Sequence, residues 1–335
     1  MEASFFKKAI DPFQYLFWKW QISILRGCPP LVSLMAKVTM GIPYSSKAWA
    51  GTFFRFAVQA PRAIHLHCQD QYERRVVLSR VVIPITTRCT LNCDKCVARI
   101  PDIAGHADIP LHELVSNIRV LLSCVDLIYV FSLSGGEPFL HPDLDKIIWA
   151  CANSGKINEF SVQTNGTIIP EANVLVALRE AKASVRISKY TPTLQPNVEK
   201  LKDILEESGI RYMYGNDESW CDKAGLGQLQ AGSAQRRFGL CAEPMCMVYM
   251  DKKLHLCAES AVLAKEQLIT DHTDDYIDLR NSDPDTFAEQ LHGLLHKRVI
   301  SACSYCLGNT YKTPKVPPAV QRQSYAAKFQ GSDMS

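Results

Sequence analysis

From residue 76 onward, short apolar runs alternate with amphipathic stretches. This alternation is typical of parallel strands joined by right-handed helical crossovers. It predicts strands at 81–86, 127–133, 159–163, 185–188 and 210–214, and helices at 111–124, 142–154 and 197–208, with Asp108 as a cap for the first helix. Further along, 246–250 and 253–257 form a predicted hairpin around Asp251 and Lys252, followed by a helix at 285–298.

Residues 1–75 have a different pattern, in which aromatic residues lie among basic ones and prolines break the segment into short, mostly helical pieces. The favoured interpretation is a helical cover packed on the rest of the protein, because aromatic stripes usually belong to a core. The alternative is peripheral contact of residues 1–60 with a membrane or a lipid-linked substrate, since aromatics beside cations suit the headgroup region.

The composition is that of a globular enzyme with a sizeable core: 335 residues, 47% of them hydrophobic. A net charge of +3, without a dense basic run, argues against a nucleic-acid partner. Thirteen cysteines, several in short clusters, point to metal binding in a reducing compartment. With no secretory signal pattern and no long uncharged apolar stretch, the expected location is cytoplasmic.

Three cysteines follow the first predicted strand in a C-x3-C-x2-C arrangement: Cys89, Cys93 and Cys96. The residues between them are mostly polar, which is unlike a set of cysteines buried as small apolar groups. Structural zinc sites have four ligands, whereas three thiolates can hold three corners of a [4Fe-4S] cube and leave one iron open. The loop therefore predicts an iron–sulfur cluster.

In spacing and in position after a strand, this loop resembles that of the radical S-adenosylmethionine (SAM) enzymes. The resemblance implies that the open iron binds SAM and that one electron cleaves it to a 5′-deoxyadenosyl radical. It also implies a partial (β/α)6 TIM-like barrel over residues 76–215. The residues expected to bind SAM lie at three strand ends: Ser134, Gly135, Gly136, Glu137 and Pro138, then Thr164 and Asn165, then Ser188.

A second set of cysteines lies in residues 216–312 and resembles the twitch/SPASM extension of that family. The resemblance implies a small auxiliary domain in which a second [4Fe-4S] cluster is bound by Cys241, Cys257, Cys303 and Cys306. A structural zinc with the same four ligands stays open as an alternative, because the spacing alone does not exclude it. Residues 313–335, rich in proline and glutamine, are expected to form a loosely ordered tail.

The resemblance implies hydrogen abstraction from a small polar, sugar-like substrate, giving oxidation or epimerisation, with flavodoxin or ferredoxin as electron donor. Cys246 and Cys221 are the candidate catalytic residues, each as a hydrogen donor to a substrate radical. One alternative is modification of a ribosomal precursor peptide to give a thioether, a carbon–carbon link or an epimer. Another is a zinc-stabilised interaction protein without enzymatic activity.

Overall fold

The computed structural model describes residues 75–103, 105–215, 219–223, 234–269, 274–280, 283–310 and 312–322. The predicted helical cover and membrane contact of the N-terminal region therefore lie outside the described residues. Within the described part, no helix has the length and apolar character needed to cross a membrane.

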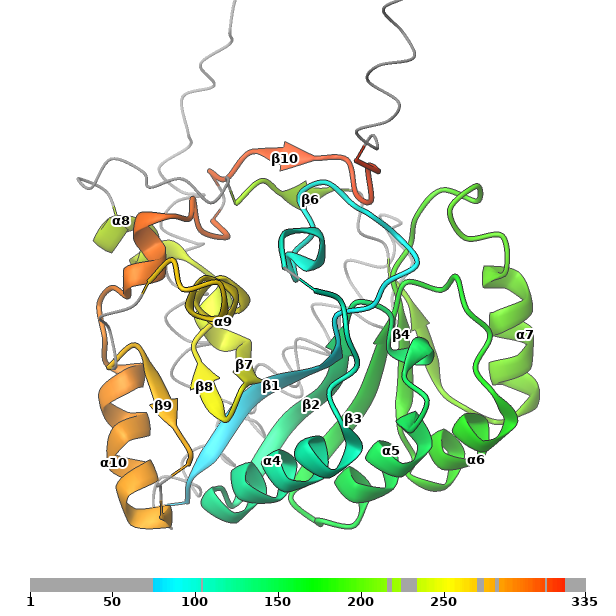
Figure 1. Cartoon of the computed structure of the whole chain (residues 1–335), viewed down its shortest axis with the longest axis horizontal. Coiled ribbons are helices and arrows are strands. Elements are labelled where there is room, and N and C mark those ends of the chain that lie inside the picture. Colours follow the sequence, from blue (N-terminus) through cyan, green and yellow to red (C-terminus); the bar gives the residue numbers. More distant parts are fainter. Residues whose placement is uncertain are drawn as a thin grey trace, which may run out of the picture.

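The main sheet has eight strands in the order β5-β4-β3-β2-β1-β7-β8-β9 (Figure 1). Strands β1 to β5 are parallel and span Val77–Thr86, Leu127–Gly135, Ile157–Thr164, Ser184–Ile187 and Tyr212–Tyr214. On the other side of β1 lies a parallel strand, β7, and then two antiparallel strands, β8 and β9: Met247–Met250, Lys253–His255 and Tyr276–Asp278. Two short strands, β6 (Trp220–Cys221) and β10 (Lys315–Val316), pair separately.

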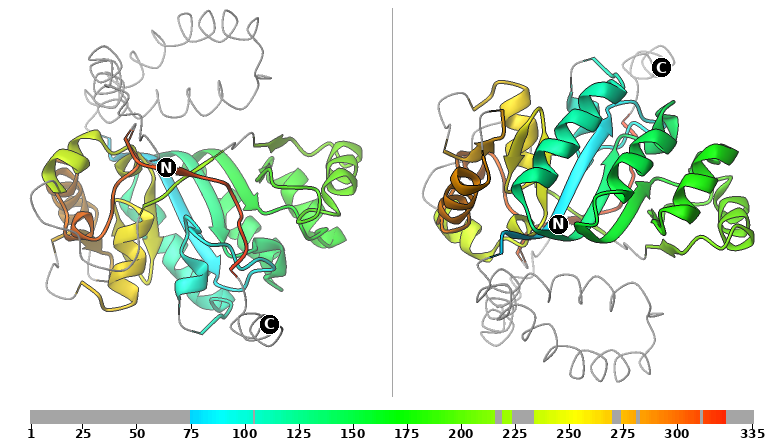
Figure 2. Two further views of the ribbon diagram at one scale, coloured as in Figure 1. Left: turned by 90° about the horizontal axis from the view of Figure 1, so that it is seen from above. Right: turned by 90° about the horizontal axis from the view of Figure 1, so that it is seen from below.

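Four helices connect the parallel strands and cover one face of the sheet (Figures 1 and 2). They are α4, α5, α6 and α7, at Leu111–Cys124, Leu144–Ala152, Ala172–Glu180 and Val198–Glu207. Three more follow β6: α8, α9 and α10, at Ala234–Leu240, Ala258–Lys265 and Pro284–Leu295. Short 3-10 helices span Ile100–Asp102, Pro138–Leu140, Glu243–Met245 and Ser301–Ser304.

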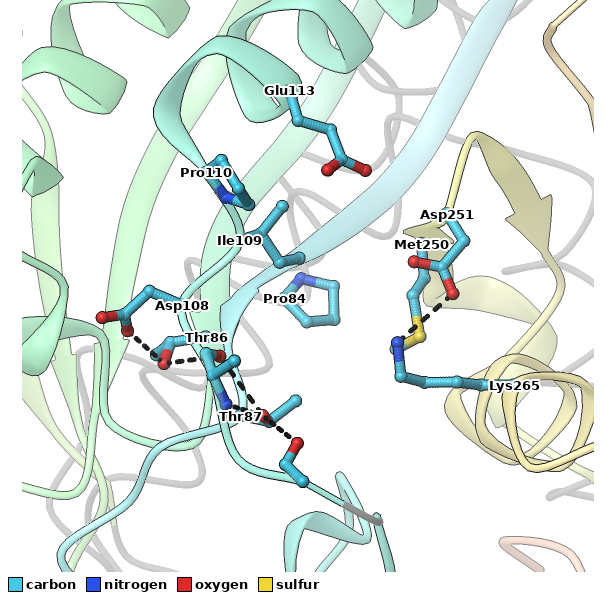
Figure 3. Close-up of a pocket in the computed structure, with 12 residues that line it drawn as sticks. Pro84, Thr86, Thr87, Asp108, Ile109, Pro110, Glu113, Met250, Asp251 and Lys265 are labelled. Carbon is cyan, nitrogen blue, oxygen red and sulfur yellow. Dashed lines mark hydrogen bonds and ion pairs between the residues drawn. The ribbon is translucent and has the colours of Figure 1, made fainter.

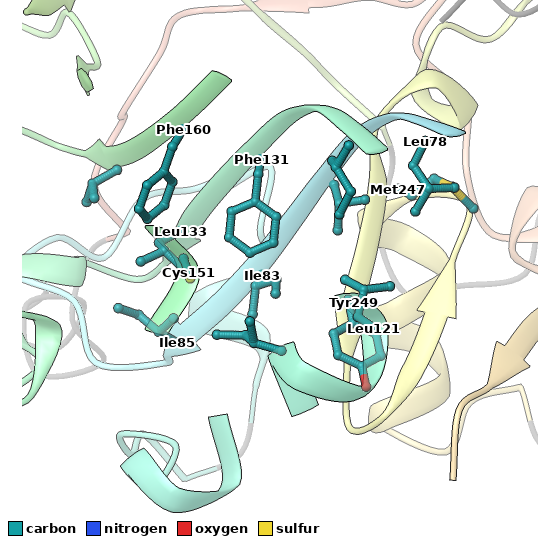
Figure 4. Close-up of a cluster of buried hydrophobic side chains, with 14 of the residues drawn as sticks. Leu78, Ile83, Ile85, Leu121, Phe131, Leu133, Cys151, Phe160, Met247 and Tyr249 are labelled. Atoms are coloured by element: carbon teal, nitrogen blue, oxygen red, sulfur yellow. The ribbon is translucent and has the colours of Figure 1, made fainter. Parts of the chain in front are cut away.

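The core between the sheet and these helices holds the strands in register (Figure 4). Val81, Ile83 and Ile85 of β1 alternate toward it, and Phe131 of β2 packs edge-on against Phe160 of β3 with ring centroids 5.7 Å apart. Burying one such side chain stabilises the fold by about 1.5–3 kcal/mol. The apolar alternation therefore fixes where each parallel strand ends, which is where the predicted site residues lie.

The α/β class with a parallel sheet is confirmed, and so is the hairpin of β7 and β8, whose turn residues Asp251 and Lys252 have φ of 51° and 60°. Two details differ from the expectation. Among the described residues, 76–215 contain five parallel strands rather than six. Asp108 does not cap α4, because it accepts a hydrogen bond from Thr86 Oγ1 at 2.7 Å and pairs with Arg88.

The largest difference from the expectation concerns residues 313–322, here called the C-terminal strap, which were expected to belong to a loosely ordered tail. The strap carries β10, which pairs with β6 in the register Lys315↔Cys221 and Val316↔Trp220. It then crosses to the cysteine loop of Cys89–Cys96, where Cys93 and Gln321 form an isolated bridge (Figures 1 and 2). Main-chain pairing at both places orders a segment whose composition alone favours disorder.

Candidate functional site

The cysteine loop directly follows β1, and its three thiols lie within electrostatic range of one another. Burial raises the pKa of all three, that of Cys93 to about 11, and the neighbouring sulfurs of Cys96 and Cys89 add to the rise. Without a cation, these groups therefore stay neutral thiols at pH 7. A bound metal stabilises the thiolate form, so three neighbouring thiols, one buried and two partly buried, fit a metal centre.

Gly135 and Gly136 allow the end of β2 to approach this loop. A Cβ on Gly135, whose φ is 135°, would lie 2.2 Å from Thr86 O, and one on Gly136 would lie 2.0 Å from Arg88 O and 3.0 Å from Cys89 Cβ. Only glycine permits such an approach. The two predicted motifs, separate in the sequence, are thus in contact.

Glu137 joins the ends of β2 and β3. Its carboxylate, fully buried, accepts hydrogen bonds from Thr164 Oγ1 at 2.8 and 2.9 Å, from Asn165 N at 2.8 Å and from Phe139 N at 3.1 Å. Burial raises its pKa to about 7, although these donors act in the opposite direction. With both oxygens engaged, Glu137 fixes the shape of the site.

Asn165 connects the third strand end to the cysteine loop. Its Nδ2 donates to Thr90 Oγ1 at 2.9 Å and approaches Cys89 Sγ at 3.6 Å, while its Oδ1 accepts from Thr167 N at 3.0 Å. Ser188 N donates to Thr164 O at 3.0 Å, which brings in the end of β4. The predicted SAM-side residues of three strands therefore form one continuous group.

Gln195 is a site residue that the sequence analysis missed. Its side-chain amide, 2% exposed, donates to Asn165 O at 2.5 Å and to Ser188 O at 2.7 Å, and it accepts from Tyr190 N at 2.8 Å. Gln195 thereby holds the ends of β3 and β4 together. The polar segment around it carries no motif that singles this glutamine out.

Tyr190 lies beside the cysteine loop and was also not predicted as a site residue. Its hydroxyl bonds to the Ser188 side chain, burial raises its pKa, and the three loop thiols lie within electrostatic range. Its ring packs edge-on against Trp220 of β6, with centroids 5.8 Å apart. Tyr190 and Trp220 therefore form an aromatic pair that connects the surroundings of the loop to β10 of the strap, because Trp220 pairs with Val316.

The second cysteine set also comes together, although its members are far apart in the chain. Cys241 lies within electrostatic range of Cys257, Cys303 and Cys306. Burial raises the pKa of each thiol, to about 11 for Cys303 and about 12 for Cys306. These four cysteines are the predicted ligands of the auxiliary centre.

Backbone amides point at two of these sulfurs. Asn309 N donates to Cys241 Sγ and Gly308 N to Cys306 Sγ, each at 3.2 Å. Such N–H···S bonds stabilise thiolates at metal centres. In the described part of the chain, no three His, Cys, Asp or Glu side chains are arranged to hold a single metal ion.

Buried charges lie near the second set. Lys223 pairs with Glu243 at 3.0 Å; burial works against its charged form, but Glu243 raises the pKa of the ammonium overall. Arg99, next to the cysteine loop, pairs with Glu259 of α9 at 2.6 Å. Paired buried ions of this kind are costly to break, so the Arg99–Glu259 pair fixes the two cysteine regions relative to each other, and the Lys223–Glu243 pair acts within the second region.

The two candidate hydrogen donors differ in surroundings. Cys246 directly precedes β7 and is partly accessible, and burial raises its pKa, so its thiol stays neutral. Cys221 of β6 lies under the strap, where its sulfur accepts from Lys315 Nζ at 2.9 Å and its thiol donates to Asn309 Oδ1 at 3.1 Å.

Two cavities flank the cysteine loop. One of roughly 610 Å³ is lined by the loop, including Cys89, together with Arg88, His106 and Gln321. Another of roughly 270 Å³ lies between the end of β1, the start of α4 and the β7–β8 turn, and contains none of the predicted site residues (Figure 3). The first cavity is therefore the one that adjoins the candidate metal centre.

Residues 83–188 match the radical SAM superfamily. The curated relatives include a probable GTP 3′,8-cyclase of Methanothermobacter thermautotrophicus, 32% identical over 151 residues, which are 43% of this chain and 46% of that protein. The GTP 3′,8-cyclase of Clostridium acetobutylicum is 28% identical over 103 residues, 30% of this chain and 31% of that protein. The chain thus spans less than half the length of these relatives.

Similar solved structures include BtrN in complex with AdoMet and 2-DOIA, with 16% identity, a TM-score of 0.43 and coverage of 68% of this chain and 92% of that one. Streptococcus suis SuiB bound to precursor peptide SuiA has 18% identity, a TM-score of 0.34 and coverage of 49% and 37%. Likeness at this level carries no information about the substrate.

Residues 83–188 therefore match a radical SAM superfamily domain, and they carry most of the parallel part of the α/β sheet. That family implies an enzyme with a [4Fe-4S] cluster and SAM, and the three thiols of the loop, beside a glycine turn, fit such a cluster.

Proposed function

We propose that the protein is a radical SAM enzyme that abstracts hydrogen from a small polar, sugar-like substrate and so oxidises or epimerises it. The observation that carries the proposal is the close packing of the glycine turn of β2 against Arg88 and Cys89, at the start of the loop that carries Cys89, Cys93 and Cys96. When bound there, a [4Fe-4S] cluster supplies the electron that cleaves SAM.

The chain's own residues supply the shape of the SAM site. The backbone of Ser134 to Pro138 packs against the start of the loop because the two glycines permit close approach, with Gly136 N donating to Thr86 O and Glu137 N to Arg88 O. The Glu137 carboxylate ties this segment to Asn165 N at the end of β3. On the opposite side of the proposed SAM site, Gln195 donates to the main-chain oxygens of Asn165 and Ser188 and so holds these two residues together. In this proposal Ser134, Gly135, Gly136, Pro138, Thr164, Asn165 and Ser188 line the SAM site, and Glu137 acts on it as a positioning residue.

The second cysteine set is proposed to hold an auxiliary [4Fe-4S] cluster in a twitch-like domain. Three buried thiols, one partly buried thiol and two amide donors to sulfur support it. Such a centre would accept an electron from a substrate radical: once the carbinol carbon has lost its hydrogen atom and the hydroxyl its proton, passing the remaining electron to the centre would give a ketone. Flavodoxin or ferredoxin is the proposed source of electrons for the first centre.

Epimerisation instead requires that a hydrogen atom return to the carbon from the opposite face. Cys246 is the favoured donor, because a thiol must be neutral to give up a hydrogen atom and burial keeps this one protonated. Cys221 is the second candidate; its thiol already bonds to Asn309. The names of the curated relatives make GTP, a sugar-containing nucleotide, a sensible early test substrate.

The decisive experiment is anaerobic reconstitution with iron, sulfide, reductant and SAM, followed by measurement of 5′-deoxyadenosine. We expect the wild-type protein to release it and Cys93→Ala to release none. Cys124→Ala, which removes a buried cysteine outside both sets, is the matched control and should retain the activity. No 5′-deoxyadenosine from well-loaded wild-type protein would refute the proposal.

Metal analysis separates the auxiliary cluster from its zinc alternative. Cys303→Ala should lose about half of the iron and sulfide while keeping SAM cleavage, because each cube has four irons. Zinc without labile sulfide in the wild type would instead support the non-enzymatic interaction protein.

Product analysis separates the two reaction outcomes once a substrate is found. Cys246→Ala should abolish product only if the enzyme is an epimerase, and full turnover would remove Cys246 from the mechanism. A precursor peptide as the accepted substrate would replace the small-molecule proposal. Co-sedimentation with anionic vesicles tests the proposed peripheral membrane contact of residues 1–60.

A further inference from the structure

Three hydrogen bonds to main-chain groups of the cysteine loop connect the C-terminal strap to it. Asp94 N donates to Val320 O at 2.6 Å, Asn92 N to Gln321 Oε1 at 2.8 Å, and Arg322 N to Asn92 O at 2.8 Å. These bonds hold the strap against the turn that contains Cys93, the middle cysteine of the loop.

Arg322 anchors the strap beyond that turn. Its guanidinium donates to Asp102 Oδ1 at 2.7 Å and to Pro101 O at 3.2 Å. On the other side, Gln321 Nε2 donates to Ala319 O at 2.7 Å, and Ala319 is buried with φ of 55°, a conformation that alanine rarely adopts. The surrounding contacts therefore fix the Gln321 side chain in one position.

In that position Gln321 Nε2 also donates to Cys93 Sγ, at 3.3 Å. Its carboxamide thus bridges the loop, with its oxygen on Asn92 N and its nitrogen on the sulfur of a predicted cluster ligand. Of the three loop cysteines, Cys93 is the buried one, and the bond to its sulfur is partly shielded from water.

We propose that Gln321 is a positioning residue that raises the reduction potential of the cluster on Cys89, Cys93 and Cys96. The inference rests on the proposed function, since it requires that cluster. Reduction adds one negative charge, which is shared with the thiolate sulfurs, so an N–H donor to sulfur stabilises the reduced state more than the oxidised state. Removal of the donor should therefore make the potential more negative.

Four variants separate this role from a merely structural one. Gln321→Glu keeps an oxygen for Asn92 N but cannot donate to sulfur when ionised, and Gln321→Met has neither group. Gln321→Lys restores a donor of similar length. Val320→Ala is the matched control on the same strap, because it trims a side chain that is 49% exposed and leaves Gln321 unchanged.

The test is a redox titration of the anaerobically reconstituted full chain, followed by electron paramagnetic resonance. The signal that changes when SAM is added identifies the cluster of interest in the presence of a second one. We expect a more negative midpoint potential in Gln321→Glu and Gln321→Met, a potential at or above that of the wild type in Gln321→Lys, and no change in Val320→Ala. Iron content of each variant reports on cluster loss independently.

A wild-type protein with a SAM-responsive signal, and Gln321 variants with an unchanged potential, would overturn this inference and leave the proposed function intact. The same holds if the variants lose iron but the remaining cluster has the wild-type potential, which is the result expected of a purely structural clamp. A wild-type protein without any SAM-responsive signal would overturn both.

Discussion

Replacing Glu137 by glutamine tests the junction between β2 and β3. The Glu137 carboxyl group accepts from two backbone N–H groups and one hydroxyl, and both of its oxygens keep acceptor lone pairs even when one carries a proton, whereas an amide can accept with one of its two terminal atoms only. One buried N–H should therefore lose its acceptor, which costs roughly 1–3 kcal/mol of unfolding free energy. Glu180→Gln, at a side chain that is 53% exposed, makes the same chemical change at the surface and should cost less than about 0.5 kcal/mol.

The pH dependence gives this test a second readout. In the folded protein the pKa of Glu137 is raised from 4.5 to about 7 by burial, so the folded state binds a proton more tightly than the unfolded state does. Stability from this group is therefore greatest below pH 4.5 and is lost as the pH rises through 7. At about 1.4 kcal/mol per pH unit, the loss is roughly 3 kcal/mol.

Urea unfolding of the metal-free protein between pH 5 and pH 8 measures both effects. The diagnostic quantity is the unfolding free energy of the wild type minus that of Glu137→Gln, because only the wild type carries the carboxyl group that titrates at this position. That difference should shrink as the pH rises, whereas the difference between the wild type and Glu180→Gln should stay nearly constant. A Glu137→Gln difference that does not change with pH, or that is no larger than the Glu180→Gln difference at pH 5, would refute the reasoning.

Three further variants probe other contacts. Gly136→Ala should prevent cluster loading on the first cysteine set, measured as iron content, because its Cβ would lie 2.0 Å from a backbone oxygen; Gly239→Ala, with open space around its Cβ, should load normally. Gln195→Met should cost roughly 2–4 kcal/mol in urea unfolding, since two buried carbonyls lose their donor. Glu259→Ala should cost roughly 3–5 kcal/mol in the same assay, because Arg99 then lacks its main buried partner.

The sequence predicted those parts of the site that depend on local spacing. The cysteine loop, the glycine turn at 135–136 and the β7–β8 hairpin are short segments whose residue types restrict backbone or ligand geometry directly. The helix at 111–124 was predicted with the boundaries that the structure shows, because its apolar spacing is regular.

What the sequence did not reveal depends on contacts between distant segments. Gln195 acts through carbonyls 7 and 30 residues away, and Gln321 through a sulfur 228 residues away, so neither has a local signal. Asp108 had the spacing of a helix cap but bonds to Thr86, because the isolated bridge between these two residues places them face to face. Composition likewise misjudged the strap, whose order comes from two tertiary pairings.

The strap has a consequence for how the protein is made. Residues 313–322 leave the ribosome after all of the cysteines in both sets, and their pairing partners at β6 and the cysteine loop are then already synthesised. Until that moment nothing from the strap covers Cys93. Nascent chains thus pass through a stage in which the cysteine loop is synthesised but Gln321 does not yet bond to Cys93.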